Sequence, residues 1–303
     1  MKRLISLCVA ALCASLTGPA RADDTSNGDI SDPSYLPTRH RLIGTTGFGY
    51  DKSSGEVDSA TGLFDHSFAT QGHGWSQLLA YGLTQQLSLG LLYAHANFDS
   101  RYEFASGAER SAHPDGTALL LGGSYRLLDQ KDRGFNFDLS GVLGSSGSLS
   151  AAISRRDEDF TVVARAGLYH VRSGTRFDLV RGSDVTVDDW WGYFANIGAQ
   201  YRPTRRFGLD FSVGYSSSNF TGGNASTMIA GQDTPFHIKY VDSLNLSIGA
   251  SLQIIPDRLV AHLSGGYSFL GKRHDDFAGT ALDTTTPRRN ARGVGLSLTY
   301  AIY

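Results

Sequence analysis

Eight charged or ionisable side chains recur in one phase of alternating segments of this chain, between small or polar neighbours. They are Arg126, Asp138, Arg165, Arg176, Asp178, Arg202, Asp210 and His262. Rings of charged side chains along a water-filled path select solutes by charge. The same groups can pair as salt bridges across short hairpins, with Arg126–Asp138 and Arg202–Asp210 as the candidate couples. The sequence leaves both roles, selectivity and structure, open for each residue.

Two acidic clusters raise hydrolytic chemistry as an alternative. Asp188 and Asp189 precede two tryptophans, and His274-Asp275-Asp276 lies near the end of the chain. Paired acids with a His–Asp dyad can activate water. Adjacent residues of a strand point to opposite faces, so Asp188 and Asp189 cannot both serve one site unless the backbone bends. We therefore expect no catalytic site. The histidines lack metal-ligand spacing, so we expect neither a metal nor another cofactor.

The elements that carry the eight charges read as extended strands. In FGLDFSVGYS, residues 207–216, every second residue is apolar and mostly large, and those between are small or polar. The pattern returns in 87–95, 135–144, 242–254 and 293–302. Alternate side chains of a strand lie on opposite faces, so one face is apolar and the other nearly bare. Repeats of this kind are typical of transmembrane β-barrels, with lipid on the bulky face and a lumen on the other.

The alternation predicts an all-β, transmembrane, antiparallel up-and-down β-barrel over residues 40–303. Twelve strands are expected near 40–51, 73–83, 87–98, 117–128, 135–147, 159–170, 175–181, 189–202, 207–218, 240–255, 259–271 and 293–303. Ten strands are the fallback, because the turn between 159–170 and 175–181 is poorly marked. Short connections such as 84–86 and 256–258 alternate with long polar ones such as 52–72 and 272–292. This asymmetry predicts short periplasmic turns and long extracellular loops.

The N-terminus predicts export. Residues 1–22 combine a basic start, an apolar stretch and a small-residue cleavage site, as in a signal peptide that is removed after export. Both cysteines, Cys8 and Cys13, fall within it. Residues 23–39 form a polar, extended segment with Pro33 and Pro37, which is able to fold into the lumen and narrow it. We expect localisation in the cell outer membrane after periplasmic transit.

The charge balance bears on the partners. The chain has 27 basic and 29 acidic residues and no basic stripe, so nucleic acid is not an expected partner. The expected partners are membrane lipids, the outer-membrane barrel assembly machinery and a small-molecule solute.

Two segments carry a family resemblance. YGLTQQLSLGL (81–91) and GGSYRLLDQ (122–130) resemble the outer-membrane proteins grouped as transporters of the phenol meta-cleavage pathway. The resemblance covers about residues 75–145 and implies uptake of hydrophobic or aromatic compounds across the outer membrane. The family has no agreed site residues to place on this chain.

The sequence therefore predicts a channel or facilitator for passive passage of small solutes, with hydrophobic or aromatic compounds as the implied class. An outer-membrane barrel enzyme, a protease or a lipid-modifying protein, is the alternative from another class. A surface adhesion or structural barrel that acts through its extracellular loops is the third.

Overall fold

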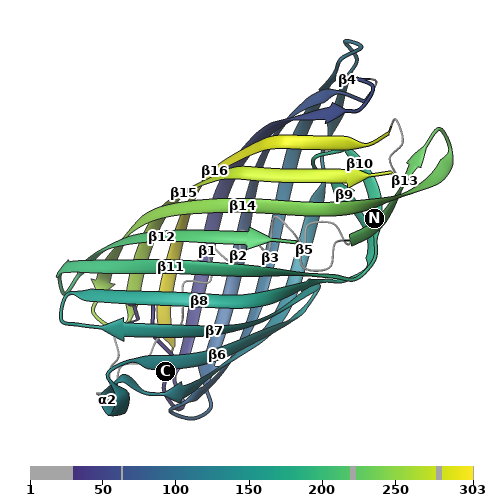
Figure 1. The fold of residues 1–303 in the computed structure, drawn as a ribbon. Coiled ribbons are helices and arrows are strands. Elements are labelled where there is room, and N and C mark those ends of the chain that lie inside the picture. Colours follow the sequence, from purple (N-terminus) through teal and green to yellow (C-terminus); the bar gives the residue numbers. More distant parts are fainter. Residues whose placement is uncertain (1–29, 63, 219–222, 278–281, 303) are drawn as a thin grey trace.

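The computed structural model describes residues 30–62, 64–218, 223–277 and 282–302. It is a single antiparallel sheet that closes on itself (Figure 1). The closed circuit runs β12-β11-β8-β7-β6-β5-β3-β2-β1-β16-β15-β14 and returns to β12 through the β12–β14 pairing. Closure leaves no free sheet edge along the circuit, which a barrel requires. The predicted fold class, an antiparallel barrel, is confirmed.

The strands of the first half of the chain are β1 (Leu42–Ser59), β2 (His66–Gly82), β3 (Leu87–Phe104), β4 (Glu109–Ala112), β5 (Asp115–Leu128), β6 (Asn136–Gly144) and β7 (Ser146–Arg156). Those of the second half are β8 (Phe160–Val171), β9 (Gly174–Asp178), β10 (Ser183–Val187), β11 (Trp190–Thr204), β12 (Phe207–Ser217), β13 (Gly223–Ile229), β14 (Gln232–Ile255), β15 (Leu259–Asp276) and β16 (Thr284–Ile302). A four-residue helix, α2 (Gln130–Arg133), connects β5 to β6. The described part of the chain holds no helix long and apolar enough to cross a membrane.

The strands differ in part from the prediction. The whole sheet has 16 strands, of which twelve form the closed circuit, while β4, β9, β10 and β13 lie off it. Residues 148–156, which lay between the predicted strands 135–147 and 159–170, belong to the wall strand β7, whose sequence SGSLSAAISRR has too few large apolar residues to give a clear alternation. Residues 175–181, expected to be a wall strand, belong instead to β9 and the tip of a hairpin outside the circuit.

The predicted long loops are also largely strand. β1 and β2 stay paired up to Val57 and His66, and β14 runs for 24 residues. Backbone pairing continues past the point where the apolar alternation ends, so the hydrophobic pattern marks only the apolar part of each strand. We call the end with these extensions the loop end, and the end with α2 and the short turns the turn end.

The two phases of the wall match the prediction. Outward residues such as Phe211, Ile248 and Leu296 are about half exposed or more, at 51%, 66% and 47%. In the other phase, Gly208 of β12 and its register partner Ser251 of β14 are buried on the inner face. Outward aromatic residues lie toward both ends, with Phe160–Tyr201 near the turn end and Tyr193–Tyr215 toward the loop end. An apolar outer surface of this extent needs an apolar environment.

Gly192 of β11 is required by a close approach across the sheet. Tyr169 of β8 faces it in register, and a Cβ at Gly192 would lie 2.2 Å from the tyrosine Cζ. By contrast, a Cβ at Gly141 would meet its nearest neighbour at 3.8 Å. Gly192→Ala should lower the free energy of unfolding by about 1–3 kcal/mol, because the ring must leave its rotamer. Denaturant titration of the refolded barrel checks this, with Gly141→Ala as the matched control. Equal stability of the two variants would contradict the packing described.

Candidate functional site: an occupied lumen and a shortened wall

Residues 30–37, which we call the N-terminal plug, lie inside the barrel at the turn end. Ile30, Tyr35 and Leu36 are buried, and the first two pack against wall residues Ile43 and Val260. The backbone carbonyl of Ser31 accepts a 2.8 Å hydrogen bond from Gln200 of β11. The plug therefore touches opposite sides of the wall, which places it across the lumen.

Asp32 holds the plug in place by charge. Its carboxylate is fully buried and lies 2.6 Å from the Arg202 guanidinium and 3.2 Å from that of Arg156. The Thr161 hydroxyl donates a further hydrogen bond of 2.7 Å to it. Buried charges persist when they are paired and hydrogen-bonded, and removal of one partner is strongly destabilising. Asp32 is thus the ionic anchor between the plug and strands β7, β8 and β11.

A second anchor uses one of the predicted couples. Arg126 donates from Nε and an Nη to the two carboxylate oxygens of Asp138, at 2.7 and 2.9 Å. A further bond of 2.9 Å runs from an Nη of Arg126 to the carbonyl oxygen of Ser34 in the plug. The Arg126–Asp138 couple is therefore present, and it also supports the plug.

The other predicted couple, Arg202–Asp210, is wrong. Arg202 binds Asp32, as described above. Asp210 instead accepts a hydrogen bond of 2.9 Å from the Gln200 side-chain amide, and its other carboxylate oxygen lies 3.1 Å from His262 Nε2. Arg202 and Asp210 do not share a register position, because Asp210 lies opposite Gln200. The sequence pattern gives no sign of Asp32, because that residue lies outside every strand.

At the loop end the lumen is crossed by β9 and β10, residues 174–187, which we call the capping hairpin. Its tip residue Leu179 packs on the buried cluster of β3 and β5. The carbonyl oxygen of Leu179 accepts a hydrogen bond of 3.0 Å from the Tyr102 hydroxyl. His66 Nε2 lies 2.8 Å from the carbonyl oxygen of Val180. Gly182 has φ +68° beside the Tyr102 ring, a turn that favours glycine. The hairpin thus starts between β8 and β11 and reaches the strands on the other side.

Two of the predicted lumen residues belong to this hairpin. Arg176 and Asp178 lie on β9, so they are not on a wall strand as expected. Asp178 lies 2.6 Å from an Nη of Arg273 in β15. Arg176 donates to the backbone carbonyl of Arg172. Their charge serves the attachment and shape of the capping hairpin.

The attachment of the hairpin is a compact network of two arginines and two aspartates. Arg273 binds Asp178 and also Asp275, the latter at 2.7 Å, and Arg181 binds Asp275 at 2.6 Å. The Arg181 guanidinium also lies over the rings of Phe236 and Phe277. Burial alone would raise the pKa of Asp178, but the charge of Arg273, assisted by Arg181 and the Val180 N–H, lowers that pKa below its usual range. The carboxylate is therefore ionised throughout the ordinary pH range.

Between plug and hairpin, the two sides of the lumen differ. The β3–β5 side is filled by a buried apolar cluster made of Leu92, Ala94, Ala96, Phe98, Ala118 and Leu120. The opposite side is hydroxyl-rich, with Ser212 bonded to Ser247 and Ser216 bonded to Ser243. Asn245 of β14 is exposed although its register faces the lumen. Solvent therefore has room on the β12–β14 side.

The shortest strand of the circuit is β6, which makes the wall low at the β6–β7 hairpin. These strands have 9 and 11 residues and are joined by Ser145 alone, whereas β1 and β3 have 18 each. Above Leu120, β5 pairs only with β3 in the described part of the chain, so its other edge is uncovered. The part of the sheet between β5 and β8 therefore ends at the β6–β7 turn, which leaves a notch on the loop-end side of that turn.

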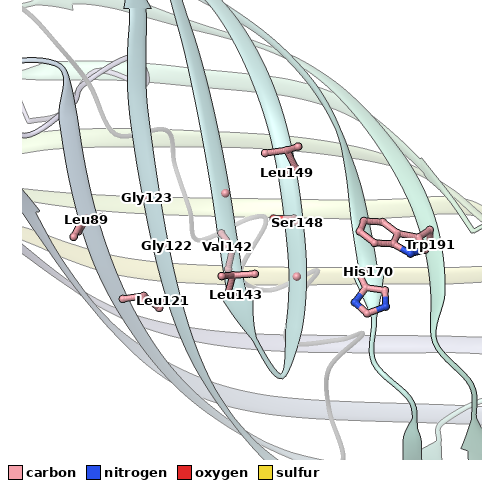
Figure 2. Close-up of a pocket in the computed structure, with 12 residues that line it drawn as sticks. Leu89, Leu121, Gly122, Gly123, Val142, Leu143, Ser148, Leu149, His170 and Trp191 are labelled. Carbon is pink, nitrogen blue, oxygen red and sulfur yellow. The ribbon is translucent and has the colours of Figure 1, made fainter.

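A depression of about 510 Å³ lies in the outer wall beside this notch (Figure 2). Glycines form much of its base and large apolar side chains its rim; the residues are Leu89, Leu121, Gly122, Gly123, Gly141, Val142, Leu143, Gly147, Ser148, Leu149, His170 and Trp191. Val142 and Ser148 belong to the lumen-facing phase, whereas Leu143 and Leu149 face outward. Residues of both phases therefore line the depression.

The acidic groups considered for hydrolysis have other partners. Asp275 is part of the arginine network, and Asp276 lies 2.5 Å from Lys239 Nζ. Asp189 accepts a hydrogen bond of 2.6 Å from the Ser173 N–H and lies 3.5 Å from His170 Nε2. These contacts attach loop-end segments to one another.

Asp178→Asn should weaken closure of the capping hairpin by about 3 kcal/mol at neutral pH, because Arg273 loses one of its two carboxylates. In the wild type the folded-state pKa is depressed, so the ionic contribution is full above about pH 4 and is lost as the pH falls through the lowered pKa. Hydrogen–deuterium exchange of residues 174–187, corrected for intrinsic rates, measures both effects. Asp184→Asn, at an exposed position of β10, is the control. Unchanged protection in Asp178→Asn would refute the anchoring role.

Asp32→Ala should release the plug, because Arg156 and Arg202 then lose their common carboxylate. Single-channel recording in a planar bilayer should show new current steps for this variant relative to the wild type. Asp157→Ala removes an exposed acid that contacts Arg155 and serves as the control. Identical recordings from Asp32→Ala and the wild type would show that the plug does not limit conduction.

No protein-family model and no curated protein matches this chain. Solved structures do. An outer membrane channel from Pseudomonas putida F1 is 14% identical over 93% of this chain and 100% of that one, with a TM-score of 0.55. The transport unit of the autotransporter AIDA-I from Escherichia coli is 13% identical over 97% and 96%, also with a TM-score of 0.55. Since barrels of different roles match equally well, the comparisons establish the fold, that of outer-membrane β-barrels, and leave the choice of function to the geometry of the site.

Proposed function

We propose that the protein is an outer-membrane barrel for passive passage of small hydrophobic or aromatic solutes, which move between the lumen and the membrane through the wall at the β6–β7 hairpin. The turn end would face the periplasm and the loop end the exterior, as short turns and long extensions do in such barrels. Only helices and closed barrels satisfy their backbone groups in lipid, and the apolar outer surface supports this location.

The observation that carries the proposal is the contrast between the ends and the wall. The plug crosses the lumen at one end and the capping hairpin at the other, both attached through buried ion pairs. The wall depression, by contrast, has an almost entirely apolar lining. An apolar solute gains free energy from such a surface and loses none to desolvation of charge. A charged hydrophilic solute would find no corresponding benefit there.

This proposal revises the expected axial path. Arg126 and Arg202 support the plug, so their substitution would change the obstruction of the lumen and not a simple charge filter. The partners that follow are membrane lipids around the wall and a small solute in it, with insertion by the outer-membrane assembly machinery. No contact among the described residues favours the enzyme or the adhesion alternative over passage of a solute.

Gly141→Phe should slow uptake of a hydrophobic solute severalfold. Gly141 is an outward position in the base of the depression, and an added Cβ meets no atom closer than 3.8 Å, so the ring can fill the space without moving the backbone. The measurement is uptake of N-phenyl-1-naphthylamine by intact cells of a Gram-negative host that produces the protein. Ala195→Phe, at an exposed outward position of β11, is the matched control.

Barrel amounts are equalised by the heat-dependent gel mobility of folded protein. Uptake that falls equally in both variants would point to a general effect of an added ring. Uptake that stays unchanged in Gly141→Phe would remove the wall route from the proposal.

A further inference from the structure

Arg165 is the one predicted lumen charge whose guanidinium has no hydrogen bond or ion pair among the described residues. It lies on the inner face of β8, opposite Ala152 of β7 and Asn196 of β11. Its Nε is buried and without a partner. Asp138 is the carboxylate that attracts it electrostatically, but both oxygens of that carboxylate are already bound by Arg126.

The residue as a whole is half-buried, but its Nε is buried, and a buried donor without a partner is costly. Such residues inside membrane proteins usually mark a solute or ion path. The wall arginines that contact the plug differ in this respect, since Arg126, Arg156 and Arg202 all contact carboxylates. Among the described residues, Arg165 therefore has no carboxylate of its own.

The surroundings of Arg165 favour an aromatic group. On the next inward positions toward the loop end, the Phe194 ring lies over Gly167, 2.9 Å from where its Cβ would be. Beyond it Tyr169 and Trp190 meet edge to face with ring centroids 5.8 Å apart. Aromatic rings at such distances interact favourably, so an aromatic solute can pack on them in the same way. The inner face of β8 and β11 thus joins one cation to a continuous aromatic surface.

The polar groups around this surface fit a carboxylate. Asn196 lies directly opposite Arg165, and its amide can donate beside the guanidinium. Arginine binds carboxylates in bidentate form, which also satisfies Nε. Ser148 and Ser150 lie on the adjoining strand β7, opposite Tyr169 and Gly167. Ser148 also lines the wall depression, so the aromatic surface adjoins the proposed route.

We propose that Arg165, with Asn196 and Phe194, forms a lumenal binding site for a small aromatic carboxylate. The carboxylate binds the Arg165 guanidinium and the Asn196 amide, and the ring packs on Phe194 and Tyr169. The inference deepens the proposed passage of aromatic solutes and names the charged class among them. The lumen would then contain a binding site for organic acids next to the apolar route through the wall.

The test is isothermal titration calorimetry of the refolded full-length mature barrel, equilibrated overnight with each probe. Benzoate should bind the wild type, whereas benzamide, its neutral isostere, should bind at least about tenfold more weakly. Cyclohexanecarboxylate should fall between them, because it retains the charge and loses the aromatic face. Arg165→Met should weaken benzoate binding at least about tenfold and leave benzamide unaffected. Arg155→Met, at an exposed arginine of β7, should bind benzoate as the wild type does.

Each other result overturns the site. These results are absence of benzoate binding, equal affinity for benzoate and benzamide, or retained benzoate affinity in Arg165→Met. Folding of Arg165→Met is checked by heat-dependent gel mobility, and Arg165→Lys, which keeps the charge without the bidentate fork, should show partial affinity. The binding assay needs no transport, so failure of uptake with intact benzoate binding would refute the proposed function and leave the site. Normal uptake without benzoate binding would do the reverse.

Discussion

Closure of the sheet is the constraint on which the rest of the structure depends. Once β12 pairs with β14, every wall residue faces either the outside or a shared interior. The outside is uniform, so its residues need only be apolar. The interior is small, so any charge there is close to other charges and must be compensated. Most of the specific chemistry of this protein follows from how that compensation is made.

The compensation is made largely by segments outside the wall. Asp32 of the plug forms ion pairs with Arg156 and Arg202, and Asp178 of the capping hairpin forms an ion pair with Arg273. The wall therefore carries excess positive charge toward the turn end, and the inserted chain supplies the negative charge. Insertion of the plug and the stability of the wall are coupled in this way. Arg165 stands apart because neither inserted segment reaches it with a carboxylate.

The sequence predicted the parts of the structure that depend on local alternation. The outward phase of β12, β14 and β16 was predicted correctly, because the large apolar residues of these strands all face outward. β7 was missed because Leu149 and Ile153 are its only large apolar residues. The strand extensions were missed because pairing beyond the apolar belt needs no apolar residues. The alternation of apolar and polar residues reveals a strand only where the two faces of that strand have different surroundings.

The candidate site was predicted only in part for a related reason. Arg126 and Asp138 are close in sequence and opposite in register, so their pairing could be anticipated. Arg202 finds its carboxylate 170 residues away, in a segment without periodicity. Asp178 was assigned to the wall because its hairpin has strand-like composition. Residues that come into contact only once the barrel has closed cannot be paired from the sequence spacing of either segment.

The unequal height of the wall has a consequence for the surrounding bilayer. Strands β6 and β7 have 9 and 11 residues, their neighbours β5 and β8 have 14 and 12, and β2 and β3 farther along the circuit have 17 and 18. At about 3.3 Å per residue and a tilt near 40°, nine residues span little more than 20 Å, less than a typical hydrocarbon core of about 30 Å. In the outer membrane that we propose for this barrel, lipids would have to thin or tilt to meet the low side, at a cost that rises with each ångström of mismatch. The barrel would then impose its own local membrane thickness, with the thinnest lipid beside the β6–β7 hairpin.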